Sequence, residues 1–394
     1  MAFCWFSAAI SDLIANIAGI LYNILGDCPD MSDIFWLAPP PKKEENYMAF
    51  DGMVVANLTS DFSQKLTGGK ISKIAQPEKD ELLFTIKNNK ETYRLQISAS
   101  ASLPFIYFTE SNKPSPLTAP NFCMLLRKHI GSARILKVSQ PGLERIIEFE
   151  LEHLDELGDL CKKRLIVEIM GKHSNIIFLD EENKIVDSIR HVSALVSSVR
   201  EVLPGRTYFI PNTREKHNPF ELTTELWMTE LTKQPVSIAK GLCNYLTGFS
   251  FSMAQEVAYR CHLDGDNPFA SCNGNQLSTL LSCLRALMEH VKNGNFEPEI
   301  VFHNGEPVEF SAFEMKRYEA EGYEHRPFES VSRMIEVFYG EKEMIQRIRQ
   351  KSADLRKNVT NLLERDQKKI DIQRKQLKDT EKRERFKVYG EHIN

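Results

Sequence analysis

The stretch from Phe328 to Asn394 constrains the fold most strongly, because it contains no proline and only two glycines, Gly340 and Gly390. The scarcity of helix breakers predicts one long helix from about Ser330. Its apolar residues recur every seven positions and then shift by one, at Ile348, Leu355, Leu362, Leu363, Ile370 and Leu377. A lone helix with so narrow an apolar seam is unstable in water. We therefore expect a coiled coil, whose second strand belongs to another molecule or to a helix that returns in a longer chain.

Charge is distributed unevenly along the chain. Residues 341–394 hold 16 Lys or Arg and 10 Asp or Glu, a net charge of +6, whereas the whole chain has a net charge of −4. Any surface for nucleic acid must therefore be a local patch. The charged face of the long helix fits plain solvation, and contact with RNA is the alternative. The length of 394 residues predicts two or three domains, and 42% hydrophobic with 26% charged residues is typical of globular proteins.

The first 47 residues need a separate interpretation. Residues 2–25 are long enough to span a bilayer, but Asp12, Asn16 and Asn23 interrupt the apolar run. Neither Lys nor Arg occurs before Lys42, so the basic flank of a signal peptide or membrane helix is missing. A second methionine, Met48, follows a proline-rich linker. We expect residues 1–47 to be an upstream extension that is unstructured or a misassigned start, with an amphipathic membrane- or partner-binding helix as the alternative.

Residues 48–215 alternate apolar and polar positions, with two helices among the strands. The apolar spacing from Met53 to Leu66 predicts a helix that ends at a Gly-Gly pair. Residues 70–99 predict a β-meander with a turn at Asn88-Asn89. After a proline-rich break, Asn121 is expected to cap a second helix that ends in Gly131. Strands resume in ARILKVSQ, RIIEFELE, KRLIVEIM, NIIFLD and KIVDSIRHV. This order predicts an α+β domain.

Three further segments follow. Residues 216–298 read as an all-α module, in which NYLTGFSFSMAQEVAYR predicts two helices around a tight turn at Gly248. A Ser252/Gln255 capping box would start the second helix. This is a helix-hairpin-helix candidate, whose turn amides would face a phosphate; a plain αα-hairpin is the alternative. Residues 299–329 form a short β connector, and 330–394 form the first coiled-coil helix.

The sequence offers little for catalysis. Signatures of hydrolases, nucleotide enzymes and dinucleotide-binding proteins are missing. Pairs such as His173 with Ser174, or Cys123 with His129, lack a third group that would orient them. The cysteines form no C-x-x-C pair, which favours small buried thiols in a reducing compartment over a metal site; they are Cys4, Cys28, Cys123, Cys161, Cys243, Cys261, Cys272 and Cys283. We expect no metal, no cofactor and no catalytic residue.

Cationic residues are grouped in one part of the chain. The first helix after the proline-rich break ends with Arg127, Lys128 and His129, and Lys172 with His173 follows a later strand. If the sheet brings the turns at residues 142–145 and 171–174 to one edge, these residues predict a phosphate-binding rim. Ordinary surface charge near strand ends is the alternative.

Several motifs resemble one known family. In this order and spacing, MAFDGMVVANL, GGKISKIAQP, FCMLLRKHI, the GLERI turn and VEIMGKHSNIIF resemble the N-terminal NFACT domain of the RqcH/NEMF family, also labelled fibronectin-binding protein A. The likeness covers residues 48–394. It implies a domain similar to formamidopyrimidine-type DNA glycosylases, then a helix-hairpin-helix module and a coiled-coil arm. Because the chain stops at Asn394 inside the first coil helix, we expect an N-terminal fragment.

The resemblance also implies a function. Such proteins are cytoplasmic ribosome quality control factors that bind an obstructed large ribosomal subunit carrying peptidyl-tRNA. In bacteria they recruit alanyl-tRNA and support template-free alanine tailing of the stalled chain. The implied partners are the large subunit, tRNA, ribosomal RNA and a coiled-coil helix from the missing C-terminal half, with no membrane. The peptidyl transfer belongs to the ribosome, so the chain itself is expected not to be an enzyme.

The resemblance carries over two groups of site residues. Glu144-Arg145 matches the family's Asp-Arg pair for tRNA recruitment, with an acid one methylene longer, so the choice of tRNA is left open. Glu168, Ile169 and Met170 match the family's Glu-Ile-Met element, so the resemblance places them with Glu144 and Arg145 in the tRNA-binding site, where Glu168 would accept from a base edge or hold Arg145. We expect Arg145 to reach tRNA, with Glu144 and Glu168 orienting it. Ile169 and Met170 would pack the strand, and Arg127, Lys128, His129, Lys172 and His173 would contact RNA phosphates.

Two other functions compete with this interpretation. The glycosylase-like fold suggests a DNA glycosylase or lyase, but those enzymes start with Pro-Glu, and this domain opens with Met48-Ala49-Phe50-Asp51. The older family label suggests a cell-surface adhesin that binds fibronectin. We expect neither a signal peptide nor a cell-wall sorting segment, so surface exposure would need an unconventional route.

Overall fold

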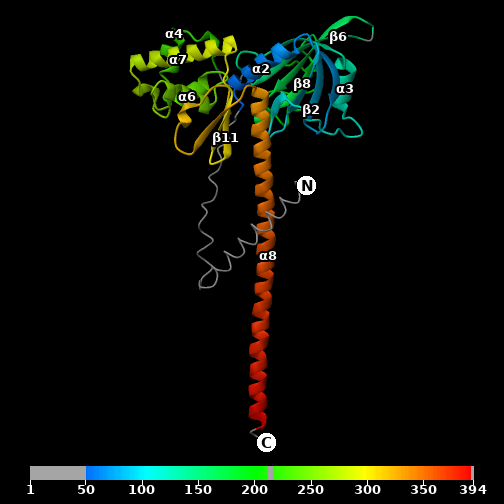
Figure 1. Ribbon diagram of the computed structural model, residues 1–394, viewed down its shortest axis with the longest axis vertical. Helices are drawn as coiled ribbons and strands as arrows, with labels where there is room; N and C mark the ends of the chain where they lie inside the picture. Colours follow the sequence, from blue (N-terminus) through cyan, green and yellow to red (C-terminus); the bar gives the residue numbers. More distant parts are fainter. Residues whose placement is uncertain (1–49, 156, 212–215, 392–394) are drawn as a thin grey trace. The chain divides into compact units, whose positions relative to one another are not determined.

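The computed structural model describes residues 50–155, 157–211 and 216–391, so the expectations for residues 1–47 lie outside the described part (Figure 1). The largest element is a nine-stranded sheet in the order β4-β3-β2-β1-β5-β6-β7-β8-β9, with every pair antiparallel. Its strands are β1 Lys70–Ala75, β2 Glu81–Asn88, β3 Glu91–Ser98, β4 Phe105–Phe108, β5 Arg134–Ser139, β6 Ile146–Leu154, β7 Leu160–Glu168, β8 Asn175–Leu179 and β9 Ile185–Ser188. The predicted mixed α and β fold is confirmed.

Helix α2, Gly52–Leu66, provides much of the core. Asp51 caps it by accepting hydrogen bonds from the backbone N–H groups of Met53 and Val54, both at 3.0 Å. Its buried residues pack against β2, β5 and β6. Helix α3, Asn121–Ile130, packs against β1 and β6. The expected cap at Asn121 is wrong, because the N-cap position is Pro120 and Asn121 is already the first helical residue.

A second cluster of helices follows the sheet. Its main helices are α5 Ile238–Tyr245, α6 Phe251–Arg260 and α7 Gly274–Asn293, preceded by the short α4 Thr224–Leu226. The expected Ser252/Gln255 capping box is wrong. The N-cap of α6 is Ser250, whose side chain accepts from the N–H of Met253 at 3.1 Å, while Gln255 donates to Asp266. Figure 1 shows α2 between this cluster and the sheet.

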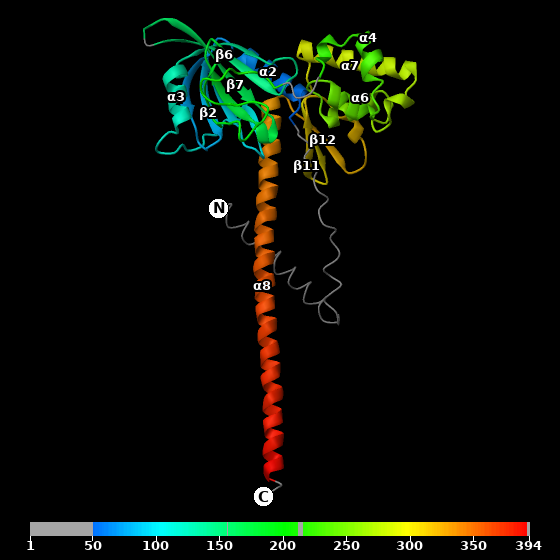
Figure 2. The ribbon, with the colours of Figure 1, turned by 180° about the vertical axis from the view of Figure 1, so that it is seen from behind.

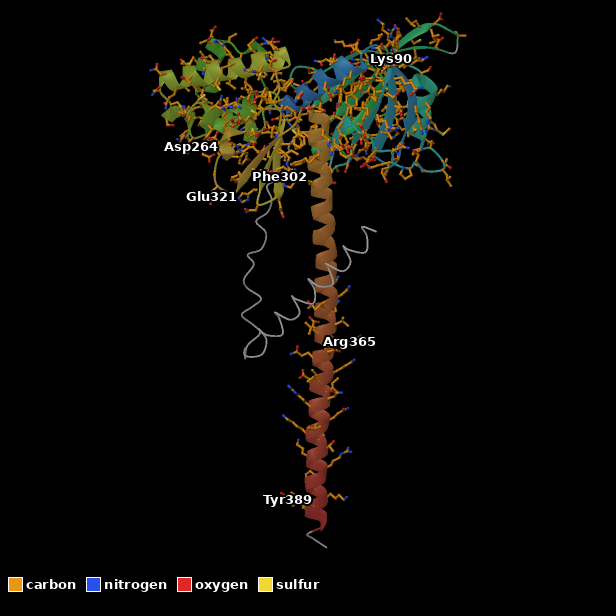
Figure 3. The ribbon with its side chains drawn as sticks, in the orientation of Figure 1. Lys90, Asp264, Phe302, Glu321, Arg365 and Tyr389 are labelled. Carbon is orange, nitrogen blue, oxygen red and sulfur yellow. The ribbon has the colours of Figure 1, made fainter. Side chains whose placement is uncertain are left out.

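The chain then forms a small sheet and a long helix. The strands β10 Glu299–His303, β11 Glu306–Ser311 and β12 Tyr323–Pro327 pair in the order β11-β10-β12. Helix α8 runs from Val331 to Glu391, so the predicted long helix is confirmed. Its first turns are buried through Val331, Met334, Ile335 and Phe338, whereas residues 357–380 are exposed throughout. Figure 3 shows Arg365 and Tyr389 standing out from it.

Candidate functional site

Three segments of backbone meet at one point beside the N-terminus of α2. The Gly52 N–H donates to the Gly248 carbonyl at 2.8 Å. A Cβ atom on Gly52 would lie 2.2 Å from the Leu143 carbonyl oxygen, and one on Gly248 would lie 2.5 Å from the Leu143 Cβ. Gly248 also has a φ of 83°, which side chains rarely tolerate. The start of α2, the turn before β6 and the turn between α5 and α6 are therefore held in direct backbone contact.

Gln140 links two of these segments. Its side-chain amide donates to the carbonyl of Gly52 at 2.9 Å and to the carbonyl of Glu144 at 2.8 Å. The turn is closed further by the Glu144 N–H, which donates to the Pro141 carbonyl at 3.0 Å. Because both carbonyls accept from one amide, the Glu144-Arg145 turn is fixed against the start of α2.

Asp51 is a buried carboxylate at the same junction. Besides capping α2, it accepts a hydrogen bond from the Ser250 hydroxyl at 3.0 Å. Desolvation raises the pKa of Asp51 to about 6, against the effect of its hydrogen bonds, and the charge of Glu309 adds to the rise. Ser250 caps α6 at the same time, so one hydroxyl joins the first turns of two helices.

Glu144 and Arg145 are both half-buried at this junction. Burial raises the pKa of Glu144, and the charges of Lys216 and Arg145 oppose that rise. Burial lowers the pKa of Arg145, and the charges of Glu144 and Asp51 oppose that change. Arg145 thus lies in the field of two carboxylates, one from its own turn and one from α2. Lys216 also donates to the Cys243 carbonyl at 2.8 Å, which ties it to α5.

The structure brings the Glu144-Arg145 turn beside the end of β7. The Ile169 N–H donates to the Arg145 carbonyl at 2.9 Å, and Ile146 pairs with Glu168 in the sheet. Ile169 is buried in the main core, and Met170 packs partly buried against the smaller apolar cluster. The expectation that Ile169 and Met170 pack the strand is confirmed. The two groups of residues predicted from motifs are neighbours in the fold.

Glu168 does not orient Arg145, and that expectation is wrong. Side chains alternate across a strand, so Glu168 points away from the main core, which holds its neighbours Val167 and Ile169. Its carboxylate is 1% exposed, forms an ion pair with Arg200, and accepts from the Tyr208 hydroxyl at 2.9 Å. Glu168 therefore anchors the segment that covers the outer face of β7, β8 and β9.

The structure brings only some of the cationic residues predicted for a phosphate rim to one end of the sheet. Lys172 and His173 lie exposed in a short helical turn at residues 171–173, directly after Met170, so the two turns do share one end of the sheet. Arg127, Lys128 and His129 lie elsewhere, because β5 begins just after their helix and reaches the site only at its other end, roughly 20 Å away. Arg127 is also engaged, since its Nε donates to the Ile74 carbonyl at 2.8 Å.

Sequence reasoning missed several residues of the site. A helix N-cap signal marks Asp51, because an acid directly before an apolar helical run is typical of that position. The turn residues Pro141 and Gly142 indicate a turn but say nothing of the Gln140 side chain. The other missed residues have no signal in the sequence because their partners are distant in the chain; they are Ser250, Lys216, Arg200 and Tyr208.

The chain is similar to proteins of one known family. The family defined by NFACT N-terminal and middle domains matches residues 51–394. The chain belongs to this family. The Rqc2 homolog RqcH of Bacillus subtilis is a similar family member, with 35% identity over 345 residues, covering 87% of this chain and 58% of that protein. RqcH of Streptococcus suis is 32% identical over 346 residues, and again the chain spans little more than half of the relative's length, 57%. The predicted family is confirmed.

Two solved bacterial structures have a similar fold. The N-terminal part of the fibronectin/fibrinogen-binding protein from Streptococcus suis has a TM-score of 0.60 at 29% identity, covering 74% of this chain and 99% of that one. The fibrinogen binding protein from Staphylococcus aureus has a TM-score of 0.61 at 28% identity, with the same coverage. Within the described residues, no group of His, Cys, Asp or Glu could hold a metal ion. No helix in that part of the chain is long and apolar enough to cross a membrane.

Proposed function

We propose that this chain is the tRNA- and ribosome-binding part of a ribosome quality control factor. It would bind an obstructed large ribosomal subunit and recruit tRNA for template-free tailing of the stalled chain. The observation that carries the proposal is the hydrogen bond from Ile169 to Arg145, which joins the two groups of motif residues at one end of the sheet. The similar proteins named Rqc2 homolog RqcH support the same role.

The roles at the site follow from exposure and charge. Arg145 is half-buried between carboxylates, which limits its rotamers and suits a guanidinium that recognises one geometry on RNA. Lys172 and His173 are exposed next to it and would contact phosphates. Arg127, Lys128 and His129 would make a separate RNA contact at the far end of β5. Glu168 would act only through the segment that it anchors.

The finer architecture belongs to the same proposal. Helices α5 and α6 around Gly248 would be the helix-hairpin-helix motif, and α8 would be the first strand of a coiled coil completed by a second helix. The proposed divisions are 48–215, 216–298, 299–329 and 330–394. The factor would work in the cytoplasm without a cofactor, and it would catalyse nothing, since peptidyl transfer belongs to the ribosome.

A filter-binding assay with purified tRNA tests the proposal. Arg145→Ala should weaken tRNA association at least about tenfold, because a charged hydrogen-bonding group is lost from the contact. Arg145→Lys keeps the charge but loses the planar geometry of the guanidinium. Its tRNA association should lie between that of the wild type and that of the Arg145→Ala variant. Arg94→Ala is the matched control, since Arg94 is exposed on β3 and donates to the Glu110 carbonyl. Unchanged tRNA association in the Arg145→Ala variant would reject the proposal.

The choice of tRNA is tested by the RNA that co-purifies with the protein from cells. We expect large-subunit ribosomal RNA together with alanine tRNA. Glu144→Asp shortens the acid by one methylene, and it should leave the recovered tRNA species unchanged if Glu144 acts on Arg145 alone. A shift to other tRNAs in that variant would assign Glu144 a direct part in selection.

Fibronectin binding is the second candidate, because a similar solved protein is described as fibronectin/fibrinogen-binding. Immobilised fibronectin separates the two candidates. Saturable binding that Arg145→Ala leaves intact, with no RNA bound, would favour the adhesin.

A further inference from the structure

The hairpin formed by β6 and β7 projects beyond its neighbours in the sheet (Figures 1 and 2). On one side, β5 pairs with β6 only as far as Glu152. On the other side, β8 pairs with β7 only from Arg164 onward. The strands β6 and β7 themselves stay paired out to Leu154 and Leu160. The last turn of the hairpin therefore stands free of both adjacent strands.

This projecting tip displays three leucines. Leu154 and Leu160 lie directly opposite each other, so their side chains share one face of the hairpin. They are 65% and 62% exposed, and Leu157 in the turn is 88% exposed. Exposed leucines are therefore concentrated at the tip, two on one face and one in the turn, and exposed apolar side chains gathered in this way mark interaction sites on soluble proteins.

The turn that carries Leu157 is ordered by its own hydrogen bonds. The Asp155 carboxylate accepts from the N–H groups of Leu157 and Asp159, each at 2.9 Å. The Asp155 N–H donates to the Asp159 carbonyl at 2.9 Å, and Gly158 adopts a φ of 87° to close the turn. A turn fixed in this way presents Leu157 with little loss of conformational entropy on binding.

Charge at the tip selects the partner. The described residues 152–155 and 157–161 contain three carboxylates, Glu152, Asp155 and Asp159, and neither Lys nor Arg. Phosphates would be repelled by this surface, whereas a protein with an apolar pocket and a basic rim would complement it. We propose that the tip, defined as residues 154, 155 and 157–160, docks into such a pocket on a basic protein of the large ribosomal subunit. The inference rests on the proposed function for the identity of the particle that carries the partner.

The tip and the proposed tRNA site are separate. They lie at opposite ends of β6 and β7, and nine residues of strand put roughly 30 Å between them. Variants of the tip should therefore leave tRNA association unchanged, and Arg145→Ala should leave the tip intact.

The first test measures binding of the 394-residue chain to purified large ribosomal subunits by co-sedimentation. Leu157→Ser should weaken binding about tenfold, because a leucine that is buried in the complex is removed. Leu117→Ser is the matched control, since Leu117 is also fully exposed but has no acidic residue close to it in the sequence. Equal binding by the Leu157→Ser variant and the wild type would overturn the inference while leaving the proposed function intact. No binding by the wild type would overturn both.

The second test reverses one charge at the tip to distinguish a basic protein from RNA as the partner. Asp159→Lys should weaken binding to the subunit if the partner is a basic protein, and strengthen it if the tip faces RNA. A photo-crosslinker at position 157 gives an independent readout. We expect an adduct that survives ribonuclease and contains a Lys- and Arg-rich peptide. A ribonuclease-sensitive adduct would overturn the inference, as would dimerisation of the wild type that Leu157→Ser abolishes.

Discussion

The carboxylate of Asp51 is buried away from water, and this single residue makes the stability of the fold depend on pH. Its pKa in the folded protein is about 6, above the usual value of 3.8. The folded state therefore binds this proton more tightly than the unfolded state. The stabilisation from Asp51 is complete below pH 4 and is lost as the pH rises through 6.

The prediction concerns Asp51→Asn, which keeps the capping oxygen but does not titrate. Between pH 5 and 7.5 the wild type should lose about 1 kcal/mol of unfolding free energy relative to this variant. Urea unfolding at the two pH values measures the difference. A difference that does not change with pH would mean that Asp51 is ionised with an ordinary pKa in the folded state.

Gln140 fixes the backbone next to Arg145, so its replacement should act on the site through position alone. Gln140→Leu removes both donated hydrogen bonds and leaves two carbonyls without that donor, which should destabilise the fold by about 2 kcal/mol. Association with tRNA should weaken although Arg145 is unchanged. Filter binding together with thermal unfolding measures both effects, and Gln255→Leu, which loses a hydrogen bond from half-buried Gln255 to exposed Asp266, is the control. Destabilisation with undiminished tRNA association would argue against a positioning role.

At the scale of elements, the contact of α2 with two turns depends on glycines. Gly248→Ala should destabilise the protein by at least about 3 kcal/mol, since the new Cβ meets Leu143 and the positive φ adds strain. Gly142→Ala is the matched control, because Gly142 also has a positive φ but faces open space. Gly142→Ala should lower the free energy of unfolding by only about 1 kcal/mol. Chemical denaturation gives both values, and equal losses would show that crowding at the junction is unimportant.

The segment at residues 189–210 is held on the sheet by Glu168. Glu168→Ala leaves Arg200 and the Tyr208 hydroxyl without their shared buried acceptor, which should destabilise the protein by about 3–5 kcal/mol. Trypsin should then cleave at Arg200 and Arg206 faster than in the wild type. Glu150→Ala removes a more exposed ion pair with Lys137 and should change nothing measurable. Unaltered cleavage in the Glu168→Ala variant would show that the segment is anchored elsewhere.

Local patterns predicted the elements better than the contacts between them. The strands β5 to β9 and the helices α2 and α8 follow from apolar spacing and turn residues in the sequence. Strand β4 was missed because its four residues stand between a Ser-rich loop and a proline-rich stretch. The expectation that Glu168 orients Arg145 is wrong because a sequence motif does not show which face of the sheet a side chain takes. A shift of one residue along β7 decides which face a side chain takes, and only the sheet reveals it.

At the scale of the whole molecule, α8 joins the two sheets at its base. Its first turns contact β4, β10, β11 and α2. The Tyr339 hydroxyl donates to the Pro104 carbonyl at 3.0 Å, and the Thr109 hydroxyl donates to Glu336 at 2.8 Å. Phe338 is 2% exposed and packs edge-on against Phe310. The base of the helix is thus part of the core.

Two substitutions by alanine, one at the base of α8 and one in its far part, compare how much each part contributes to stability. Phe338→Ala should destabilise the protein by about 3–5 kcal/mol through the cavity that it leaves. Leu377→Ala, at a position 67% exposed, should change the unfolding free energy by less than about 0.5 kcal/mol. Thermal unfolding of the two variants measures the contrast. A large loss in the Leu377→Ala variant would mean that the far part of α8 is packed in the isolated protein.

The firmly seated base of α8 has a mechanical consequence. A helix of 61 residues is about 90 Å long, so a tilt of about 5° at its base would move its far end by about 8 Å. The same leverage acts in reverse, because a load on the far end exerts a torque on the aromatic cluster of Phe50, Phe105, Phe310 and Tyr339. Phe50 directly precedes Asp51 and Gly52, so this torque would act next to the junction that holds Arg145.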